Sequence, residues 1–474
     1  MTIPEPAPPP VSLFEAREPI FPRRVYGWFR NLKWWIMAVT LGIYYITPWL
    51  RWDRGPNLPD QAVLVDMASR RFFFFMIEIW PHEFYFVAGL LVMAGLGLFL
   101  FTSAAGRVWC GYACPQTVWT DLFILVERWI EGDRNARLRL HRQSWDGEKV
   151  RKRAVKWFVW LLIAIGTGGA WVFYFTDAPT LLGNLLAGTA HPAAYITVAI
   201  LTATTFAFGG FAREQICIYA CPWPRIQAAM MDEDTLTIGY REWRGEPRGK
   251  QGMEGNGDCI DCMACVNVCP MGIDIRDGQQ MACITCGLCI DACNDTMDKI
   301  GRPRDLIGYL ALTDETAERA GKEPKSVWNH MLRPRTILYT VLWAGVGIGL
   351  VVALFVRPEM DVSVTPMRNP TFVMLSDGAV RNTYDLRLRN KHGEDRRFRL
   401  SLTSEAPLRI ALEGTDELSV LVPANQTMEQ RVYVVASPGS AGAVEDRSVL
   451  RFWIEDISGD ERVSKDTIFN GKAD

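Results

Sequence analysis

Long apolar runs punctuate the first three quarters of the chain. Each comes close to the length that a helix needs to cross a bilayer, which is about 20 residues with a lower limit of about 17. The first run sits at that limit, and the other four are of ordinary length for membrane helices. The five runs are residues 34–50, 84–101, 157–175, 193–211 and 336–356. The pattern therefore predicts five transmembrane α-helices.

The last part of the chain has a different pattern. From residue 358 onward, apolar and polar residues alternate in short runs between turn residues, as in Tyr384-Asp-Leu386-Arg-Leu388. A period of two is typical of strands with one buried face. About seven such strands in about 115 residues without cysteine predict an immunoglobulin-like sandwich. We therefore expect a multi-domain membrane protein with an all-β C-terminal domain at residues 357–474.

Lysine and arginine are distributed unevenly between the loops, and this distribution sets the orientation. The loop after the second run is rich in both, whereas the loop between the third and fourth runs has neither. The first of these loops is therefore predicted to be cytoplasmic. The N-terminal tail (1–33) and the long segment 212–335 then lie on the same side, and residues 357–474 are periplasmic. Four residues disagree with this orientation: Arg51, Arg54, Arg70 and Arg71.

The cysteines indicate metal chemistry. All 12 fall into four tight groups, whereas disulfide frameworks scatter cysteines through a small secreted fold. Grouped thiols in a large chain are typical of metal ligands. The net charge of −2 gives no reason to expect nucleic acid as a partner.

Two of the groups each have the cysteine spacing of bacterial two-cluster ferredoxins, and both lie within about residues 255–300. Each set of three closely spaced thiolates binds three irons of one [4Fe-4S] cubane, and the fourth ligand comes from the other set. Zinc sites use two distant pairs instead. Asn294 stands where a second Cys-Pro is expected. The predicted ligands are Cys259, Cys262, Cys265 and Cys293 for the first cluster, and Cys269, Cys283, Cys286 and Cys289 for the second.

The other two groups are copies of one motif, Cys-x-Tyr-Ala-Cys-Pro. Cys110 and Cys114 follow the second apolar run, and Cys217 and Cys221 follow the fourth. Residues 34–211 therefore look like two related hairpins, whose shared site lies where the halves meet. Soft thiolates select Cu(I), zinc or iron–sulfur clusters, and they also cycle between dithiol and disulfide. Packing alone does not account for repeated pairs.

Two histidines allow a weaker hypothesis. His82 and His191 each stand at the start of a run, where they could ligate a b-type haem between helices. A polar residue that caps a membrane helix is the commoner explanation.

These motifs carry a family resemblance. Two Cys-x3-Cys-Pro turns and a two-cluster segment resemble the membrane ferredoxins that include NapH and NosR. Three further segments narrow the resemblance to the CcoG family, also called FixG or RdxA. These segments are Glu131-Gly-Asp-Arg-Asn-Ala-Arg137, Ala212-Arg-Glu-Gln-Ile-Cys217 and Cys221-Pro-Trp-Pro-Arg-Ile-Gln-Ala-Ala-Met-Met-Asp-Glu-Asp234. The resemblance implies a protein of the bacterial inner membrane that assists assembly of cbb3-type cytochrome c oxidase.

The resemblance also implies an activity, the reduction of Cu(II) to Cu(I) for the oxidase. Cys110, Cys114, Cys217 and Cys221 are then the expected copper or redox thiols, with oxidase assembly factors or copper chaperones as partners. Two other functions stay open: a quinol-linked electron relay like NapH, and an assembly scaffold with non-catalytic clusters. The electron donor, the oligomeric state and the role of the C-terminal domain are not predicted by the sequence.

Overall fold

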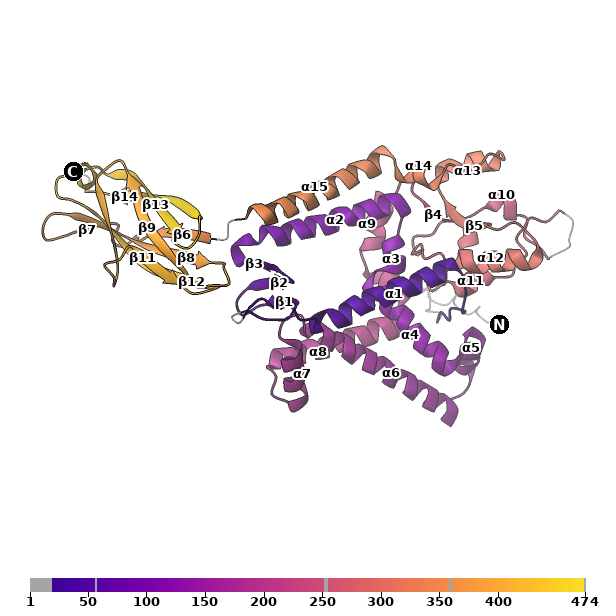
Figure 1. Ribbon diagram of the computed structural model, residues 1–474. Coiled ribbons are helices and arrows are strands. Elements are labelled where there is room, and N and C mark those ends of the chain that lie inside the picture. The colour runs from indigo at the N-terminus through magenta and orange to yellow at the C-terminus, as the bar shows by residue number, and fades with distance from the viewer. Residues whose placement is uncertain (1–18, 56–57, 251–254, 358–359, 473–474) are drawn as a thin grey trace, which may run out of the picture. The chain divides into compact units, whose positions relative to one another are not determined.

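A computed structural model describes residues 19–55, 58–250, 255–357 and 360–472 (Figure 1). Residues 1–18 of the predicted N-terminal tail lie outside the described residues. The chain divides into two compact units, residues 1–50 with 62–349 and residues 51–61 with 350–474. The first unit holds the membrane helices and the ferredoxin segment, and the second holds the β-rich domain.

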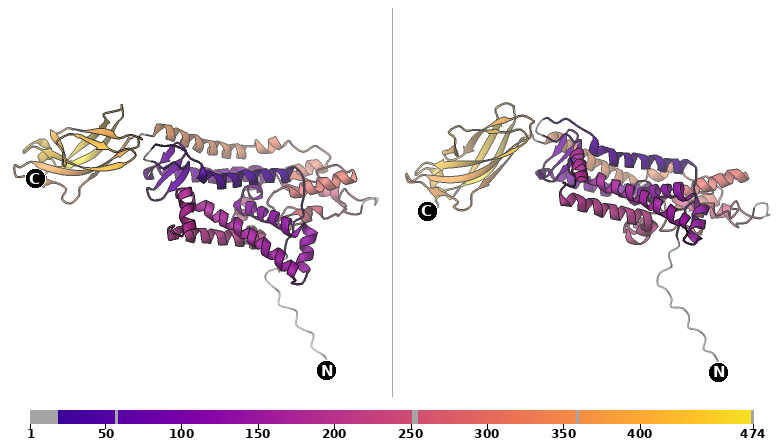
Figure 2. Two further views of the ribbon diagram at one scale, coloured as in Figure 1. Left: turned by 60° about the horizontal axis from the view of Figure 1, so that its bottom comes forward. Right: turned by 90° about the horizontal axis from the view of Figure 1, so that it is seen from below.

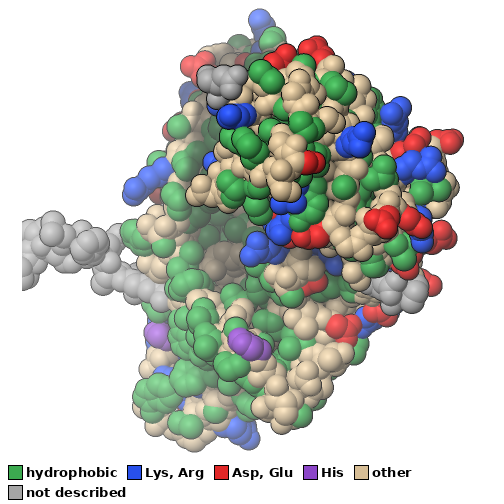
Figure 3. All heavy atoms as spheres, turned by 90° about the vertical axis from the view of Figure 1, so that its left-hand side faces the viewer, with side chains coloured by type: hydrophobic (Ala, Val, Ile, Leu, Met, Phe, Trp, Pro, Cys, Tyr) green, Lys and Arg blue, Asp and Glu red, His purple; other side chains and the backbone are tan. Residues whose placement is uncertain are grey.

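Four helical segments in the described part of the chain are long and apolar enough to cross a membrane. Their large apolar side chains are mostly exposed, as lipid contact requires. Figure 3 shows hydrophobic side chains gathered over part of one face of the molecule. α2 (Tyr85–Ala105) lies beside α15 (Pro334–Val356), where the rings of Phe99 and Tyr339 are 5.8 Å apart (Figures 1 and 2). The four segments are Pro81–Ala105, Gly147–Val172, Pro192–Ala212 and Pro334–Val356.

The first predicted span, residues 34–50, belongs to a helix that starts earlier. α1 runs from Trp28 to Ile46 and includes Arg30 and Lys33, so it is not among the four apolar segments. Both cations are buried beside Asp121 of α4 (Pro115–Glu131), with nitrogen–oxygen distances of 3.0 and 3.6 Å. At its other end α1 packs on α6 (Gly147–Val172). A fifth crossing therefore remains a prediction.

α4 buries three acidic residues, Asp121, Glu127 and Glu131. Glu127 meets three cations from three different segments: Arg137 of α5 (Arg134–Arg142), Lys156 of α6 at 3.2 Å and Arg213 at 2.6 Å. Burial opposes ionisation of Glu127, but Arg213, Arg137 and Lys156 together lower its pKa to about 2. The ion cluster joins the two hairpins, because α4 follows the first and Arg213 ends the second.

The ferredoxin segment is a small α+β unit. β4 (Thr237–Tyr240) pairs antiparallel with β5 (Ile307–Leu310), and two helices, α11 (Ala264–Val268) and α12 (Leu288–Ile300), pack against each other. The surrounding short helices are α10 (Glu242–Gly245), α13 (Leu312–Arg319) and α14 (Val327–Met331). The sequence did not predict a three-stranded sheet between α1 and α2, formed by β1 (Val63–Asp66), β2 (Arg71–Phe74) and β3 (Ile77–Ile79).

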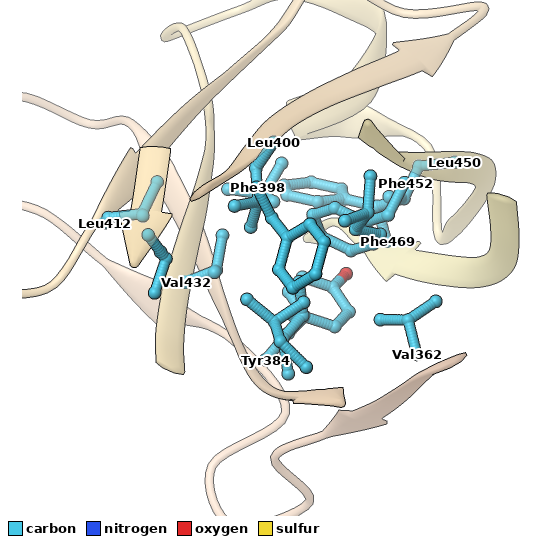
Figure 4. Close-up of a cluster of buried hydrophobic side chains, with 14 of the residues drawn as sticks. Val362, Tyr384, Phe398, Leu400, Leu412, Val432, Leu450, Phe452 and Phe469 are labelled. Carbon is cyan, nitrogen blue, oxygen red and sulfur yellow. The ribbon is translucent and has the colours of Figure 1, made fainter. Parts of the chain in front are cut away.

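The C-terminal domain is a sandwich of two antiparallel sheets, as predicted. One has the order β10-β12-β8-β6 with β7 paired to β8, and the other β11-β9-β13-β14. Tyr384, Phe398, Phe452 and Phe469 fill the space between them (Figure 4). The strands are β6 (Met360–Pro366), β7 (Val373–Met374), β8 (Val380–Asn390), β9 (Arg396–Ser404), β10 (Leu408–Leu412), β11 (Ser419–Val422), β12 (Thr427–Ala436), β13 (Arg447–Asp456) and β14 (Arg462–Asn470).

We expect Glu127→Gln to destabilise the membrane unit by about 3 kcal/mol or more, because it leaves three cations without their shared carboxylate. Since the folded-state pKa of Glu127 is depressed, its contribution is present above its ordinary pKa of 4.5 and is lost as the pH falls toward 2. Thermal unfolding of the purified protein measures the effect. Glu148→Gln is the control, because Glu148 is exposed and pairs with Lys152 of the same helix. Equal unfolding temperatures for the two variants would contradict the prediction.

Candidate electron-transfer site

The two cysteine loops of the ferredoxin segment share one backbone conformation. Asp261 and Met263 flank Cys262 with φ values of 54° and 57°, and Thr285 and Gly287 flank Cys286 with 53° and 75°. Left-handed residues on both sides of the middle cysteine bend each loop around an enclosed space. Three of these four residues are not glycine, which indicates that the rest of the fold maintains the bend.

Each loop closes one cavity, and the two cavities exchange one cysteine. Cys293, from the helix that follows the second loop, lines the cavity of the first loop. Cys269 likewise lines the cavity of the second loop. The first cavity therefore has Cys259, Cys262, Cys265 and Cys293, and the second has Cys269, Cys283, Cys286 and Cys289, with Cys265 also at its wall. The structure thus brings together the two predicted ligand sets, and the binding of each thiol to a cluster remains a prediction.

The donor set fits cubane clusters better than single ions. Within the described ranges, no three His, Cys, Asp or Glu side chains meet closely enough to hold one metal ion. Thiols spaced around a cavity are what a [4Fe-4S] cluster needs, because each thiolate binds a different iron. Burial raises the pKa of Cys265 to about 11 and that of Cys269 to about 12, so loading a cluster must release protons. A bound cluster would supply one-electron transfer.

Asn294 explains the missing second Cys-Pro. It lies inside α12, which continues to Ile300, and a proline there would break the helix. Its side-chain oxygen accepts a hydrogen bond from the Asp305 backbone at 2.8 Å. The departure from the ferredoxin pattern therefore extends a helix and leaves Cys293 in its cavity.

The two Cys-x-Tyr-Ala-Cys-Pro turns are structural copies. Cys110 lies in α3 (Val108–Tyr112) and Cys217 in a π-helical turn (Ile216–Ala220). The Cys114 amide donates to the Trp109 carbonyl at 3.0 Å, and the Cys221 amide donates to the equivalent Ile216 carbonyl at 2.8 Å. The repeat extends further back, since Gly106 and Arg213 end the preceding helices with similar angles, φ 60° and 42°.

The four thiols of these turns, which we call the repeated thiols, lie close enough to affect one another. Burial and the other three thiolates raise the pKa of Cys217 to about 12, against the opposing effect of Arg107. Cys114 comes directly before α4, and Pro222 separates Cys221 from α9 (Trp223–Met230). A helix N-terminus therefore closely follows each turn, and the positive end of a helix favours a nearby anionic thiolate.

The first turn touches the second ferredoxin loop. A Cβ atom on Gly111 would lie 2.5 Å from the Ile284 carbonyl oxygen and 3.1 Å from the Cys286 Cα atom, so only glycine fits. The Tyr112 hydroxyl donates to the Cys286 carbonyl at 3.0 Å. Cys110 and Cys217 pack on the buried cluster that contains Cys286. The repeated thiols are therefore next to the second predicted cluster.

Sequence reasoning missed several residues that build this site. Arg107 is buried and donates to the carbonyl of Met281, near the second loop. Gln227 is fully buried, accepts a hydrogen bond from the Cys110 thiol at 3.2 Å and donates to Thr102. The sequence offered one signal that the first turn lies close to another part of the chain. The two motifs differ at one position, where the first has Gly111 and the second has the bulkier Ile218.

His191 has a structural role in the fold. It is the N-cap of α8 (Pro192–Thr205), where its Nδ1 atom accepts the Ala193 amide at 3.2 Å. His82 lies in a short 3₁₀ turn, 4.0 Å from Glu83. The contact of His191 agrees with helix capping, and a haem between the two histidines stays a hypothesis.

Arg276 lines the first cavity and is held by Asp261 and Asp274, each at 2.6 Å. We expect Arg276→Gln to lower the reduction potential of the first cluster, because it removes a positive charge that stabilises the reduced form. A loss of about 1.4 kcal/mol corresponds to about 60 mV for one electron. A redox titration followed by EPR measures the shift, with the exposed Arg304→Gln as control. An unchanged or higher potential would refute this role.

Comparisons with known proteins agree with this geometry. A 4Fe-4S dicluster domain model matches residues 212–311, and a 4Fe-4S binding domain model matches residues 86–133. A third model, an IG-like fold at the C-terminus of FixG, matches residues 350–472. Within residues 86–133 the only cysteines are Cys110 and Cys114.

Several relatives match over nearly the whole length. RdxB and RdxA of Cereibacter sphaeroides are 72% and 69% identical, covering 97% and 95% of this chain and 98% and 96% of their own. The nitrogen fixation protein FixG of Rhizobium meliloti is 51% identical and covers 97% of this chain and 94% of its own. The ferredoxin-type protein NapH of Escherichia coli is 20% identical over 57% of this chain and 89% of its own. The chain therefore belongs to the FixG/RdxA family of iron–sulfur electron-transfer proteins.

Proposed function

We propose that this protein is a cupric reductase that supplies Cu(I) for the assembly of cbb3-type cytochrome c oxidase. The observation that carries the proposal is the direct contact between the turn holding Cys110 and the loop holding Cys286. An electron on the second cluster then has a short path to a group of thiols. Copper is the substrate in this reaction, and copper chaperones or oxidase assembly factors are the proposed recipients.

The chemistry balances with one electron for each copper ion. A reduced cluster gives one electron to Cu(II) and returns to its oxidised state, and the product is Cu(I). Thiolates are soft ligands that bind Cu(I) tightly, so they favour the reduction. Arg107 lies near both Cys110 and Cys283, and its positive charge favours the anionic state of both groups.

Two other functions compete with this proposal. NapH, a ferredoxin-type protein, matches part of the chain, and a relay from quinol to another protein would use the same clusters. A scaffold would use the β-sandwich and keep the clusters for structure. The match of residues 350–472 to a FixG domain favours the reductase over the relay, because a NapH-like relay has no need of that domain.

The first experiment adds Cu(II) to reduced, desalted protein purified without oxygen. We expect Cu(I), read with a chelator, to form in step with cluster oxidation followed by EPR. A variant with serine at Cys110, Cys114, Cys217 and Cys221 should keep its cluster signals and lose this reaction. If the wild-type clusters stay reduced after copper is added, the relay or scaffold function takes the place of the reductase.

Iron analysis of the same samples distinguishes the occupants of the repeated thiols. Two cubane clusters predict about eight irons per chain, and a third cluster predicts about twelve. A loss of about four irons in the serine variant would assign a cluster, rather than copper, to the repeated thiols.

The contact itself is tested by Gly111→Ala. Its new methyl group would displace the first turn from the backbone of the second loop, since no flexible side chain is there to move. We expect cluster-to-copper electron transfer to slow at least about tenfold, because small displacements of reacting groups have large effects on rate. Gly166→Ala is the control, because nothing lies within 4 Å of its added atom. Stopped-flow mixing with Cu(II) measures the rates, and equal rates would show that the contact is not the path.

A further inference from the structure

A cavity of about 440 Å³ lies between the chain that leads into α1 and the C-terminal half of α4. Three of its lining residues are arginines, Arg24, Arg30 and Arg128, and none is acidic. The aromatic rings of Tyr26, Trp34 and Trp129 also line it. We call this space the arginine cavity. Neither the clusters nor the repeated thiols border it.

The arginines carry more positive charge than their partners balance. Arg30 is only 3% exposed, and its Nη1 atom binds Asp121 while Nη2 has no hydrogen-bond partner among the described residues. The buried Nε atom of Arg128 likewise has no hydrogen-bond partner among the described residues. Buried guanidinium donors without partners are costly, and they are the groups that an anionic ligand would satisfy.

Nearby carboxylates are already used. Asp121 is shared by Arg30 and Lys33, at 3.0 and 3.6 Å. Asp133 and Asp291 accept backbone amides instead, from Arg24 at 2.9 Å and from Arg30 at 2.8 Å. Burial, followed by the charge of Arg30, lowers the pKa of Arg128 to about 10, which reports the same excess of cations. The cavity therefore favours an added negative charge.

The cavity opens at the boundary of the membrane region. Leu125 and Trp129 lie on the outer face of α4 and line the cavity, and Trp129 is 78% exposed. The same helix buries most of its other apolar side chains, so Leu125 and Trp129 are the large apolar side chains that it leaves free to meet lipid. Exposed tryptophans beside arginines are typical of the headgroup level of a bilayer.

We propose that the arginine cavity binds the phosphate group of an anionic ligand, either a phospholipid headgroup or a soluble phosphate compound. Guanidinium groups match phosphate oxygens in pairs, which lysines do not. The site also has a structural consequence. Asp291 belongs to α12, between two predicted cluster ligands, and it accepts the backbone amides of Phe29 and Arg30. A phosphate bound to Arg30 would therefore stabilise the attachment of α1 to the ferredoxin segment.

The test uses full-length protein, delipidated in neutral detergent and titrated separately with phosphatidylglycerol, phosphatidylcholine and inorganic phosphate. Unfolding temperature and native mass spectrometry report binding. We expect phosphatidylglycerol to raise the unfolding temperature and to form a defined adduct, with binding at least about tenfold weaker in Arg128→Gln. Stabilisation by inorganic phosphate, weakened by the same change, would assign a soluble phosphate compound instead. Equal effects of the two lipids, or no binding of any of the three probes, would overturn the proposal.

Two variants separate binding from folding. Arg139→Gln removes an exposed arginine of α5 that does not line the cavity, so its response to phosphatidylglycerol should equal that of the wild type. Without lipid, Arg128→Gln relieves the crowding of cations but loses the hydrogen bonds from Arg128 to the carbonyls of Pro22 and Arg23, so the effect of lipid is measured against each variant's own lipid-free unfolding temperature. If Arg128→Gln unfolds earlier without lipid and still binds phosphatidylglycerol normally, the arginine is structural and the proposal fails.

Discussion

The contact between the first Cys-x-Tyr-Ala-Cys-Pro turn and the backbone around Cys286 is the constraint on which the rest of the site depends. Gly111 leaves room for the Ile284 carbonyl, and the Tyr112 hydroxyl binds the Cys286 carbonyl. Both residues directly follow Cys110, so the thiol and the loop are held at a fixed separation. Supporting contacts come from α1, whose start is bound to α12 through Asp291. A ferredoxin-like fold is thereby joined to membrane helices without a flexible linker at the proposed point of electron transfer.

The repeat does not produce two equal halves. The backbone hydrogen bonds and helix-ending angles match, yet Tyr112 is 5% exposed and Tyr219 is 67% exposed. Only the first turn meets the ferredoxin loop through a tyrosine hydroxyl. The second turn instead follows a π-helical segment (Phe206–Ala212), a local irregularity that is frequent at functional sites. Arg213 has the left-handed conformation that Gly106 has at the equivalent position of the first half. The guanidinium of Arg213 donates hydrogen bonds to Glu127 and to the Gly210 carbonyl. The first half is therefore hydrogen-bonded to the second ferredoxin loop, whereas the second half packs beside that loop and is also tied into the ion cluster of α4.

Much of this arrangement could be predicted, because the spacing of the cysteines reflects the local geometry of the loops that carry them. Short spacings within each loop imply a shared cavity, and the exchange of Cys269 and Cys293 follows from the pattern itself. Alternation in the C-terminal domain also indicated its sandwich correctly. The start of α1 was missed because Arg30 and Lys33 are charged, so the apolar run in the sequence begins only after them. Their burial depends on Asp121, which is distant in the sequence. Likewise, no local pattern shows that Glu127 meets cations from three other segments.

The exchanged cysteines have a consequence for how the protein matures. Because each cavity borrows a thiol from the loop of the other, neither cluster is complete until both loops have folded. If these thiols bind the clusters, incorporation of iron and sulfide at one cavity would organise the other, so we expect loading to be cooperative rather than stepwise. Oxidative loss of one cluster would release a ligand of its neighbour as well. Under iron shortage, such a chain would divide into fully loaded and empty molecules, with few half-assembled carriers that accept electrons and cannot pass them on.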